Sequence, residues 1–512
     1  MALKDTISSN STELLAARQN DPKLIPQNAD WFEREPNEYG DFGRQNDKVA
    51  RRPINSSRMP KKGTLVGYKA SAGFTFDFTS QNSLPTFEEF LFANCRRKGM
   101  VKSESILADG YVLSSGGTLF NAGDIIFVEG VSAAIGNLGR KILSADAVDA
   151  KISLAGLTID ADAVVTINRV GHRFASGDLS VSVVNGLPRL NSAAYDMTDL
   201  GLLPGEQVYI GSDDAANRFA NAANQGWVRI KVITEDYLEL DKTDAQFVVD
   251  AGAGKLVEIY FGDVVKNEAA LENQVHHYVA FRRRLGQPTI GSNTVQSEVV
   301  FGNLANELTF SIPEKDKTTI EVAYMGRDHK SFDDDNDVDA GGNIIKVEEA
   351  DALNSTGDLK LVRLWVYKKG VEQTASPTPL ISGFTEIELN INNNLSETNV
   401  LTQMGTFAHT PGFFDITCTM SGCFVEVGAM TPLNENLDLT MSAVFARDNR
   451  GVGFDIPLMS GTSDGPQVEM NEPITIEIEN EAADGRKYLP TFDHMLLVNY
   501  YNWLPSSATT IS

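Results

Sequence analysis

The sequence has few cysteines, no long apolar run and no apolar start. Its three cysteines, Cys95, Cys418 and Cys423, are too few for a disulfide framework. The first residues lack the apolar core of a signal peptide, and no stretch approaches the roughly eighteen apolar residues that a membrane helix needs. We therefore expect a reduced protein, made in the cytoplasm, that does not span a membrane.

Basic residues are also scarce. The 512 residues include 44 Lys and Arg against 69 Asp and Glu, which gives a net charge of −25. A protein that binds nucleic acid through its phosphates needs an excess of basic over acidic residues. Residues 1–62 differ from the rest, because they hold eleven basic and nine acidic residues. Specific DNA binding is therefore not expected, and the first segment is expected to behave differently from the remainder.

Motifs for catalysis and cofactor binding are missing. The sequence has no GxSxG elbow, no HExxH, no CxxC pair and no GK[ST] after a glycine-rich turn. We predict no catalytic, cofactor-binding or metal-binding residues and no enzyme activity. Two basic islands, Arg51–Lys62 and Arg282–Gly286, could bind DNA in principle, but ion pairs with acidic residues of adjacent subunits are the preferred interpretation.

One acidic stretch, Asp333–Glu349, invites a calcium interpretation. Five of its residues fall at positions 1, 3, 6, 8 and 12 of an EF-hand loop: Asp337, Asp339, Gly342, Ile344 and Glu348. Position 5 is Gly341 and flanking helices are not evident, so a solvated acidic hairpin is favoured. His276 and His277 are adjacent, and a strand there would send their rings to opposite faces, which disfavours joint metal ligation.

Local patterns predict strands and one clear helix. Alternation of Phe74, Phe76 and Phe78 with polar residues indicates a half-buried strand. Apolar residues at helical spacing predict a helix from Ser83 to Gly99, with acidic residues early and basic residues late. The polar residues before about 60 show no sustained apolar period, so we expect an extended arm that orders on a partner.

An internal similarity separates two segments by 82 residues. Gly123–Gly130 resembles Gly205–Ser212, and Asn137–Gly156 then matches Asn224–Thr243 as strand, turn and strand. Glycine supplies the positive φ that such turns need. Two small β-barrel-like modules in tandem are predicted. The second contains a longer connection at 212–226, which is expected to form a short helix or a surface loop.

Antiparallel strands are predicted for most of the chain after residue 261. In residues 384–395 the apolar set is Ile387, Leu389 and Ile391, and polar residues including Glu386 and Glu388 alternate with it. One face of this sheet is therefore expected to be buried and the other to be wet and acidic.

Four blocks of sequence resemble the major tail tube proteins of long-tailed phages with non-contractile tails. The blocks cover residues 51–93, 200–231, 296–317 and 381–424. No single motif is diagnostic, and the specificity lies in the order of the blocks. The resemblance implies a mainly β protein with two tail-tube β-sandwich units, a flanking α-helix and two inserted β-barrel-like modules.

The resemblance also implies a function. Three chains with two fused units would form a pseudo-hexameric ring, and stacked rings would form a helical tube through which the genome is ejected. The implied partners are further copies of the chain, the tape measure protein and viral DNA inside the lumen without specific binding, and tail terminator and tail tip proteins at the ends. The protein would be made in the bacterial cytoplasm and end in the virion tail.

The expected division of the chain has six parts. They are an extended arm, the first part of tube unit 1, inserted modules a and b, the second part of tube unit 1, and tube unit 2, at residues 1–59, 60–117, 118–168, 169–261, 262–350 and 351–512. Two other readings stay open: a glycan-binding surface adhesin, and a polysaccharide-processing enzyme with two carboxylates converging in a groove.

Overall fold

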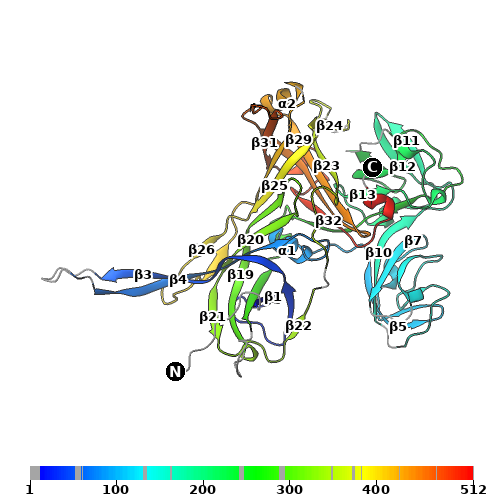
Figure 1. The fold of residues 1–512 in the computed structure, drawn as a ribbon. Helices are drawn as coiled ribbons and strands as arrows, with labels where there is room; N and C mark the ends of the chain where they lie inside the picture. Colours follow the sequence, from blue (N-terminus) through cyan, green and yellow to red (C-terminus); the bar gives the residue numbers. More distant parts are fainter. Residues whose placement is uncertain are drawn as a thin grey trace. The chain divides into compact units, whose positions relative to one another are not determined.

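The fold is mainly β, with several sheets and few helices (Figure 1). It is given by a computed structural model that describes residues 12–51, 59, 61–130, 135–161, 164–241, 247–286, 295–347, 350–371, 375–381, 383–425, 427–468 and 470–510. The chain divides into two compact units. Unit 1 comprises residues 1–93, 270–354 and 386–419, and unit 2 comprises residues 94–269, 355–385 and 420–512.

Unit 1 is a β-sandwich whose two sheets share one long strand. Its elements are β1 (Thr12–Gln19), β2 (Asp30–Arg34), β3 (Pro36–Arg51), β4 (Lys61–Asp77), α1 (Leu84–Phe90), β18 (Tyr278–Leu285), β19 (Gln296–Ile312), β20 (Thr319–Gly326), β21 (Asp328–Phe332), β22 (Asn343–Ile345), β25 (Phe384–Asn392), β26 (Ser396–Thr398) and β27 (Ala408–Thr410). One sheet runs β22-β2-β1-β18-β19-β21 and the other β3-β4-β20-β19-β25. The first residues of β19 belong to one sheet and the last to the other, with a register shift after Ala305.

Aromatic side chains join the two sheets. The ring of Phe281 from β18 lies 5.5 Å from that of Phe74 on β4 and 4.7 Å from that of Tyr324 on β20. Phe90 of α1 adds an edge contact to Tyr324 at 5.2 Å. Such edge-to-face rings fill the interior with large apolar surfaces. The predicted strand around Phe74 and the predicted flanking helix therefore both contribute to this core.

The N-terminal segment differs from the extended arm that its composition predicts. Strand β1 lies between β2 and β18, and Leu14, Leu15 and Trp31 are fully buried. The apolar run of β1 is short and lies among polar residues, so it hardly changes the polar composition of the N-terminal segment. Its partner β18 lies more than two hundred residues along the chain, and only this long-range pairing supplies the buried surface. Residues 1–11 lie outside the described part.

The helix is shorter than the sequence predicts. It ends at Phe90, and Phe92 two residues later has a φ of 48°, in the left-handed region that stops a helix. The expected cap, Ser83, makes no side-chain capping bond. The basic residues predicted for its last turn lie beyond the helix and form ion pairs: Arg97 Nη1 lies 2.8 Å from Asp263 Oδ2, and Lys98 pairs with Glu206 within unit 2.

Unit 2 combines a second antiparallel sheet with the two inserted modules. Its elements are β5 (Met100–Leu107), β6 (Gly110–Leu113), β7 (Asp124–Gly130), β8 (Gly139–Ile142), β9 (Lys151–Ser153), β10 (Val165–Arg173), β11 (Ser180–Val184), β12 (Leu187–Asn191), β13 (Gln207–Ile210), β14 (Gly226–Ile233), β15 (Tyr237–Asp241), β16 (Glu258–Tyr260), β17 (Asp263–Lys266), β23 (Leu359–Val366), β24 (Thr378–Ile381), β28 (Asp415–Cys423), α2 (Met430–Asn434), β29 (Asp438–Arg447), β30 (Arg450–Thr462), β31 (Thr475–Ala482), β32 (Leu497–Tyr501) and α3 (Ser506–Thr509). The second sheet contains the path β17-β32-β30-β29-β23-β24, and β31 pairs with the end of β30.

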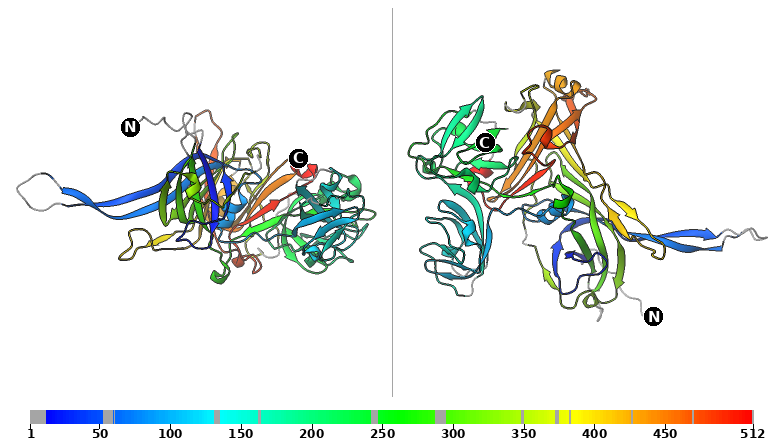
Figure 2. Two further views of the ribbon diagram at one scale, coloured as in Figure 1. Left: turned by 90° about the horizontal axis from the view of Figure 1, so that it is seen from below. Right: turned by 180° about the vertical axis from the view of Figure 1, so that it is seen from behind.

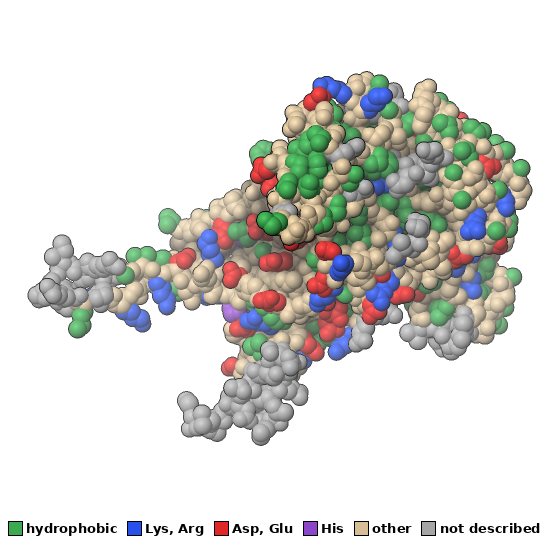
Figure 3. Space-filling view, turned by 45° about the horizontal axis from the view of Figure 1, so that its top comes forward, with side chains coloured by type: hydrophobic (Ala, Val, Ile, Leu, Met, Phe, Trp, Pro, Cys, Tyr) green, Lys and Arg blue, Asp and Glu red, His purple; other side chains and the backbone are tan. Residues whose placement is uncertain are grey.

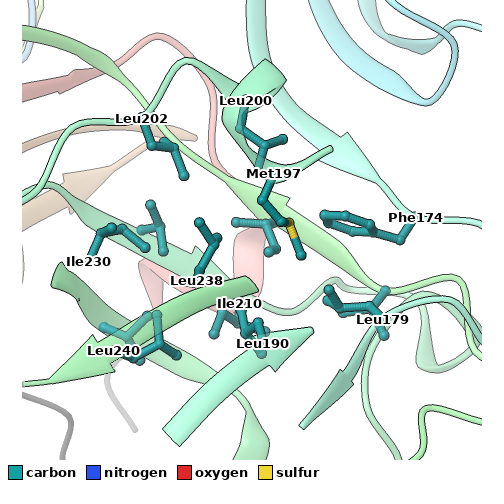
Figure 4. Packing of buried hydrophobic residues seen from close by; sticks show 14 of the residues in the cluster. Phe174, Leu179, Leu190, Met197, Leu200, Leu202, Ile210, Ile230, Leu238 and Leu240 are labelled. Carbon is teal, nitrogen blue, oxygen red and sulfur yellow. The ribbon is translucent and has the colours of Figure 1, made fainter. Parts of the chain in front are cut away.

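Each inserted module has its own apolar core. The core of the first draws on residues from Val101 to Ile167. The core of the second is lined by strands β12 to β16 and holds Phe174, Met197 and Leu238 among its side chains (Figure 4). A third cluster joins residues of both modules, such as Ile125 of the first and Trp227 of the second, to residues of the second sheet. The modules are therefore packed on that sheet within unit 2.

The internal repeat is visible in the backbone. Gly123 and Gly205 precede β7 and β13 with φ values of 87° and 97°, and Gly139 and Gly226 begin β8 and β14 with φ values of 87° and 117°. Both copies thus place glycine where the turn needs positive φ. They differ afterwards, because β15 pairs with β14 whereas β9 pairs with β6. The long connection at 212–226 forms two short 3-10 turns, Ala215–Asn217 and Ala222–Asn224.

Candidate assembly surfaces

One exposed feature of unit 1 is the ribbon formed by β3 and β4. The two strands stay paired from Pro36 with Phe76 out to Arg51 with Lys61. From Arg44 to Ala50 every residue of β3 is exposed, and beyond Tyr68, where the loop at Met404 contacts β4, the ribbon has little cover. In both views of Figure 2 the hairpin projects from the rest of unit 1. A two-stranded ribbon without a covered face is only marginally stable in water, and a partner would stabilise it.

The outer part of this hairpin is basic. Its exposed charged side chains, in Arg44–Ala50 and Lys61–Lys69, are those of Arg44, Lys48, Lys61, Lys62 and Lys69 against the single acid Asp47. Figure 3 shows Lys and Arg side chains along the projecting ribbon. Residues 52–58 and 60 of the basic island lie outside the described part. An acidic protein thus presents a cationic, uncovered ribbon, which suits a partner of opposite charge.

The second basic island, in β18, is engaged inside its own chain. Arg282 is buried and its Nε lies 2.7 Å from Asp335 Oδ1, while the Nε of Arg284 lies 2.9 Å from the other oxygen of the same carboxylate. Arg283 pairs with Glu298. The prediction of ion pairs is confirmed, but the prediction that adjacent subunits supply the acids is wrong for these three arginines. The tertiary fold brings the acids from the neighbouring strand and from the loop after β21.

One sheet of unit 1 carries acids on its outward face. On β25 the residues Ile387, Leu389 and Ile391 are buried, and Glu386 and Glu388 are exposed, as the alternation predicts. The neighbouring strands β19 and β20 add exposed Glu307 and Glu321, opposite their own buried apolar residues. No Lys or Arg occupies an outward position of β20, β25 or the last part of β19. This face is hydrated and negatively charged.

The same pattern recurs in unit 2 on β31. Ile476 and Ile478 are fully buried, whereas Glu477, Glu479 and Glu481 are exposed along one face of the strand. Three carboxylates spaced two residues apart repel one another unless the face is well hydrated. Each unit therefore contains a sheet strand with a glutamate-bearing face.

The acidic stretch after β21 has structural uses for its carboxylates. Asp339 accepts hydrogen bonds from the backbone N of Asn28 at 2.8 Å and of Ala29 at 3.0 Å, and from Trp31 Nε1 at 3.1 Å. These donors lower the pKa of Asp339 despite its burial. Of the other candidate calcium ligands, Asp337 is exposed and Glu348 lies outside the described residues. Among the described residues no group of three or more His, Cys, Asp or Glu could hold a metal ion.

The histidine pair lies in a loop before β18 and not in a strand. His277 Nε2 is 3.1 Å from the carbonyl oxygen of Ala93, and the ring of His276 packs edge-on against Phe92 at 4.8 Å. Burial lowers the pKa of both imidazoles. The two histidines therefore hold the segment that follows α1 in place. The alternation of the flanking sequence could not predict these contacts.

A buried polar joint in unit 2 fixes module b on the second sheet. Arg229 of β14 is fully buried and forms two 2.7 Å contacts with Asp241 of β15. The same guanidinium reaches the second sheet through Thr440 Oγ1 at 3.2 Å and Tyr367 Oη at 3.0 Å, and it contacts Asp455 at 3.5 Å. The nearby carboxylates hold the pKa of Arg229 well above its usual value, against the effect of burial. Sequence reasoning missed this joint, because nothing local marks Arg229.

The geometry described so far is that of a structural protein with uncovered, charged sheet surfaces, and a comparison with known families agrees. A family model described as phage tail tube protein matches residues 9–482. The chain belongs to the phage tail tube protein family. No curated protein matches the sequence closely enough to report.

Membership of this phage tail tube family suggests what the exposed, charged surfaces are for. A tail tube protein is a structural component of the virion tail and assembles with further copies of itself into a tube. No helix in the described part of the chain is long and apolar enough to cross a lipid bilayer. The ribbon of β3 and β4 and the glutamate-bearing faces are therefore candidates for contacts between copies and for the surface of the lumen.

Proposed function

We propose that three chains form a pseudo-hexameric ring and that stacked rings form the tube of a non-contractile phage tail, the conduit for genome ejection. One observation supports this most strongly: each compact unit contains an antiparallel sheet with one apolar, buried face and one face with exposed glutamates. Two units of this kind in each chain would allow threefold symmetry to approximate a sixfold ring. Pairing sheet edges between chains would cover edges that are otherwise open to aggregation.

The glutamate-bearing faces would line the lumen. Glu321 and Glu388 of unit 1 lie on strands β20 and β25, and Glu479 of unit 2 lies on β31; these three strands contain no Lys or Arg. Carboxylates repel DNA phosphates over roughly a Debye length of 8 Å at physiological salt, so the genome and the tape measure protein would slide without specific binding. Tail terminator and tail tip proteins would close the two ends of the tube.

The division of the chain follows as part of the proposal. Residues 60–117 with 262–350 would build most of tube unit 1 and residues 351–512 most of tube unit 2, while modules a and b, 118–168 and 169–261, would decorate the exterior. Compact unit 1 also holds residues 386–419, so β25 to β27 would join the sheet of tube unit 1. The apolar core of module a, which begins at Val101, favours moving its start to about residue 100. The chain would be made in the host cytoplasm before it joins the tail.

Electron microscopy of the purified protein tests the assembly directly. Hollow tubes or rings with threefold symmetry are the expected result. Monomers that stay inert at high protein concentration and physiological salt would contradict the proposal. A tube built from six chains in each ring would contradict only the trimeric part.

The hairpin is proposed to make the contact between rings. Removing residues 1–59 would damage the core, since Leu15 and Trp31 are buried in it. A cleaner variant replaces residues 47–67 with an Asn-Gly turn, which joins the paired strands beyond Asn46 and Tyr68. This variant should fold and form single rings without tubes. Tubes of normal length would rule out the hairpin as the stacking element.

The lumen assignment has its own test. The double variant Glu321→Lys and Glu388→Lys should still form tubes, because both side chains are exposed. Phage assembled with it should eject DNA more slowly and with a stronger salt dependence, since lysines on the wall would hold phosphates. A matched variant changes Glu314 to Lys in the exposed turn after β19, away from the sheet face. Equal ejection rates for both variants would contradict the assignment.

A further inference from the structure

Unit 1 contains a small open cavity at the base of the hairpin, with a volume of about 230 Å³. Its wall includes the rings of Tyr68, Phe301 and Phe407, the cations Lys23 and Arg327, and Asp328. We call it the hairpin-base pocket. The volume lies below the roughly 300–1,000 Å³ of pockets for drug-sized ligands and cofactors. It is sufficient for one side chain of a partner.

Cations surround this pocket and have no acidic partner among the described residues. The guanidinium of Arg327 lies 5.7 Å from the ring centre of Phe407, Arg44 lies 3.5 Å from that of Tyr68, and Lys330 lies 5.6 Å from that of Phe301. None of these three cations, nor Lys23, forms an ion pair within the described part of the chain. In a protein with 69 acidic and 44 basic residues, four such cations around three adjacent rings leave an unusual unneutralised positive field.

The acid in the wall does not cancel this field. Asp328 accepts a hydrogen bond from the hydroxyl of Tyr68, and the backbone N of His329 lies 2.8 Å from its Oδ1. Burial and this carboxylate raise the pKa of Tyr68 to about 12, so the phenol stays protonated and donates at neutral pH. These hydrogen bonds hold Asp328 to β4 and to its own strand, while the side chain of Lys23 is exposed to incoming groups.

The loop that supplies Gln403 and Phe407 to the wall also carries exposed apolar side chains. The loop between β26 and β27 is tied to β4 by a 3.1 Å hydrogen bond from Tyr68 N to the carbonyl oxygen of Met404. Leu401, Met404 and Phe407 of this hairpin are 91%, 55% and 43% exposed. Aromatic, Met and Arg side chains are the types enriched at the centre of protein interfaces. A free inorganic anion gains nothing from exposed apolar side chains nearby, whereas a protein partner can bury them.

We propose that the hairpin-base pocket receives a side-chain carboxylate from a second copy of this chain. The proposal rests on the proposed tube function, which brings copies together. The occupant's chemistry follows from charge: Lys23 and Arg327 can hold one carboxylate by charge-assisted hydrogen bonds, and each copy has a net charge of −25. Leu401 and Met404 then pack against the surface around that carboxylate.

Zero-length cross-linking tests the contact. A carbodiimide joins an amine and a carboxylate that touch, and tubes made from a mixture of ¹⁴N- and ¹⁵N-labelled chains distinguish links between copies from links within one chain. The expected product in tubes is an amide between Lys23 and an Asp or Glu of another copy, absent in dilute unassembled protein. The Lys23→Arg variant keeps the charge and should lose the product while forming tubes normally. Lys23 links only within one chain would overturn the proposal.

Assembly measurements provide a second readout. The double variant Lys23→Gln and Arg327→Gln should need at least about tenfold more protein to form tubes and should show a weaker dependence on salt. The matched control, Lys315→Gln, removes an exposed cation of unit 1 elsewhere and should assemble like the unchanged protein. If the double variant assembles at the same concentration, the pocket proposal fails and the tube function stands. If the unchanged protein forms no tubes, the tube function fails, and the pocket proposal with it.

A different anion source would be revealed by the same samples. Tubes that form only after added double-stranded DNA, with Lys23 still uncrosslinked to protein, would show that a phosphate occupies the pocket. That result would overturn the assignment of a second copy as the partner.

Discussion

Charged residues are used in opposite ways by the hairpin of unit 1 and the module joint of unit 2. On the hairpin, Arg44 and Lys48 are exposed and have no acidic partner among the described residues. In the joint, Arg229 and Asp241 are fully buried and bonded to each other at 2.7 Å. Exposed, unpaired charge is available to a second molecule, whereas buried, paired charge holds one geometry inside the chain. The contrast separates surfaces for assembly from surfaces that keep the modules in place.

The largest expected effect comes from breaking the buried joint. Changing Arg229 to Met leaves the carboxylate of Asp241 buried without its partner, which should destabilise the protein by about 3–5 kcal/mol. Thermal unfolding followed by circular dichroism measures this. Lys487→Gln is the matched control, because that cation of unit 2 is 68% exposed and its pair with Asp438 should contribute little. Similar melting curves for the two variants would show that the joint does not hold the module.

A somewhat smaller loss is expected from the first strand of unit 1. Leu15 is fully buried in a cluster with Trp31, Val299 and Val338, and Leu15→Ala should cost about 2–5 kcal/mol through lost burial and the cavity left behind. Phe32→Ala on the neighbouring strand β2 is the control, because Phe32 is 50% exposed. If Leu15→Ala melts like the unchanged protein, the N-terminal segment is the detached arm that composition suggests, and the contrast between covered core and uncovered hairpin disappears.

The pH dependence should be moderate and should come from both units. Burial lowers the pKa of five of the six histidines: His276, His277, His329, His409 and His494. Their folded pKa values lie below the unfolded value of about 6.5, so the unfolded chain binds more protons as the pH falls. Stability is therefore full above about pH 7 and declines as the pH drops below about 6.5.

His494 isolates the contribution of unit 2 to this decline. It is buried beside Asp493, whose oxygen is 3.9 Å from its Nδ1. The His494→Gln variant should show a shallower loss of stability between pH 7 and pH 5, by up to about 1.4 kcal/mol per pH unit. Melting temperatures across that range measure the slope. An unchanged slope would assign the pH dependence to the four histidines of unit 1.

The smallest effect on stability is expected at the glutamate-bearing faces. Glu388→Gln and Glu479→Gln should each shift stability by no more than about 0.5 kcal/mol, because both side chains are exposed on hydrated faces. A loss comparable to that of Leu15→Ala would show that these carboxylates have partners inside the chain and do not belong with the free surface charges.

The sequence alone determined features that repeat at short range. The alternation around Ile387 and Glu388 fixed which face of β25 is buried, because side chains alternate along any strand. The glycines of the internal repeat determined where tight turns fall, since their φ values of 87° to 117° suit residues without a Cβ. The mainly β fold and the resemblance to tail tube proteins followed from such local patterns and their order.

Only the tertiary structure decided the long-range partners. It placed β1 beside β18, gave Arg282 and Arg284 the carboxylate of Asp335, and buried Arg229 against the second sheet. It also ended α1 at Phe90, because the residues that follow contact other parts of the chain. These outcomes depend on pairings between residues far apart in the chain, and short-range periodicity carries no record of which distant strand or charge will be the neighbour.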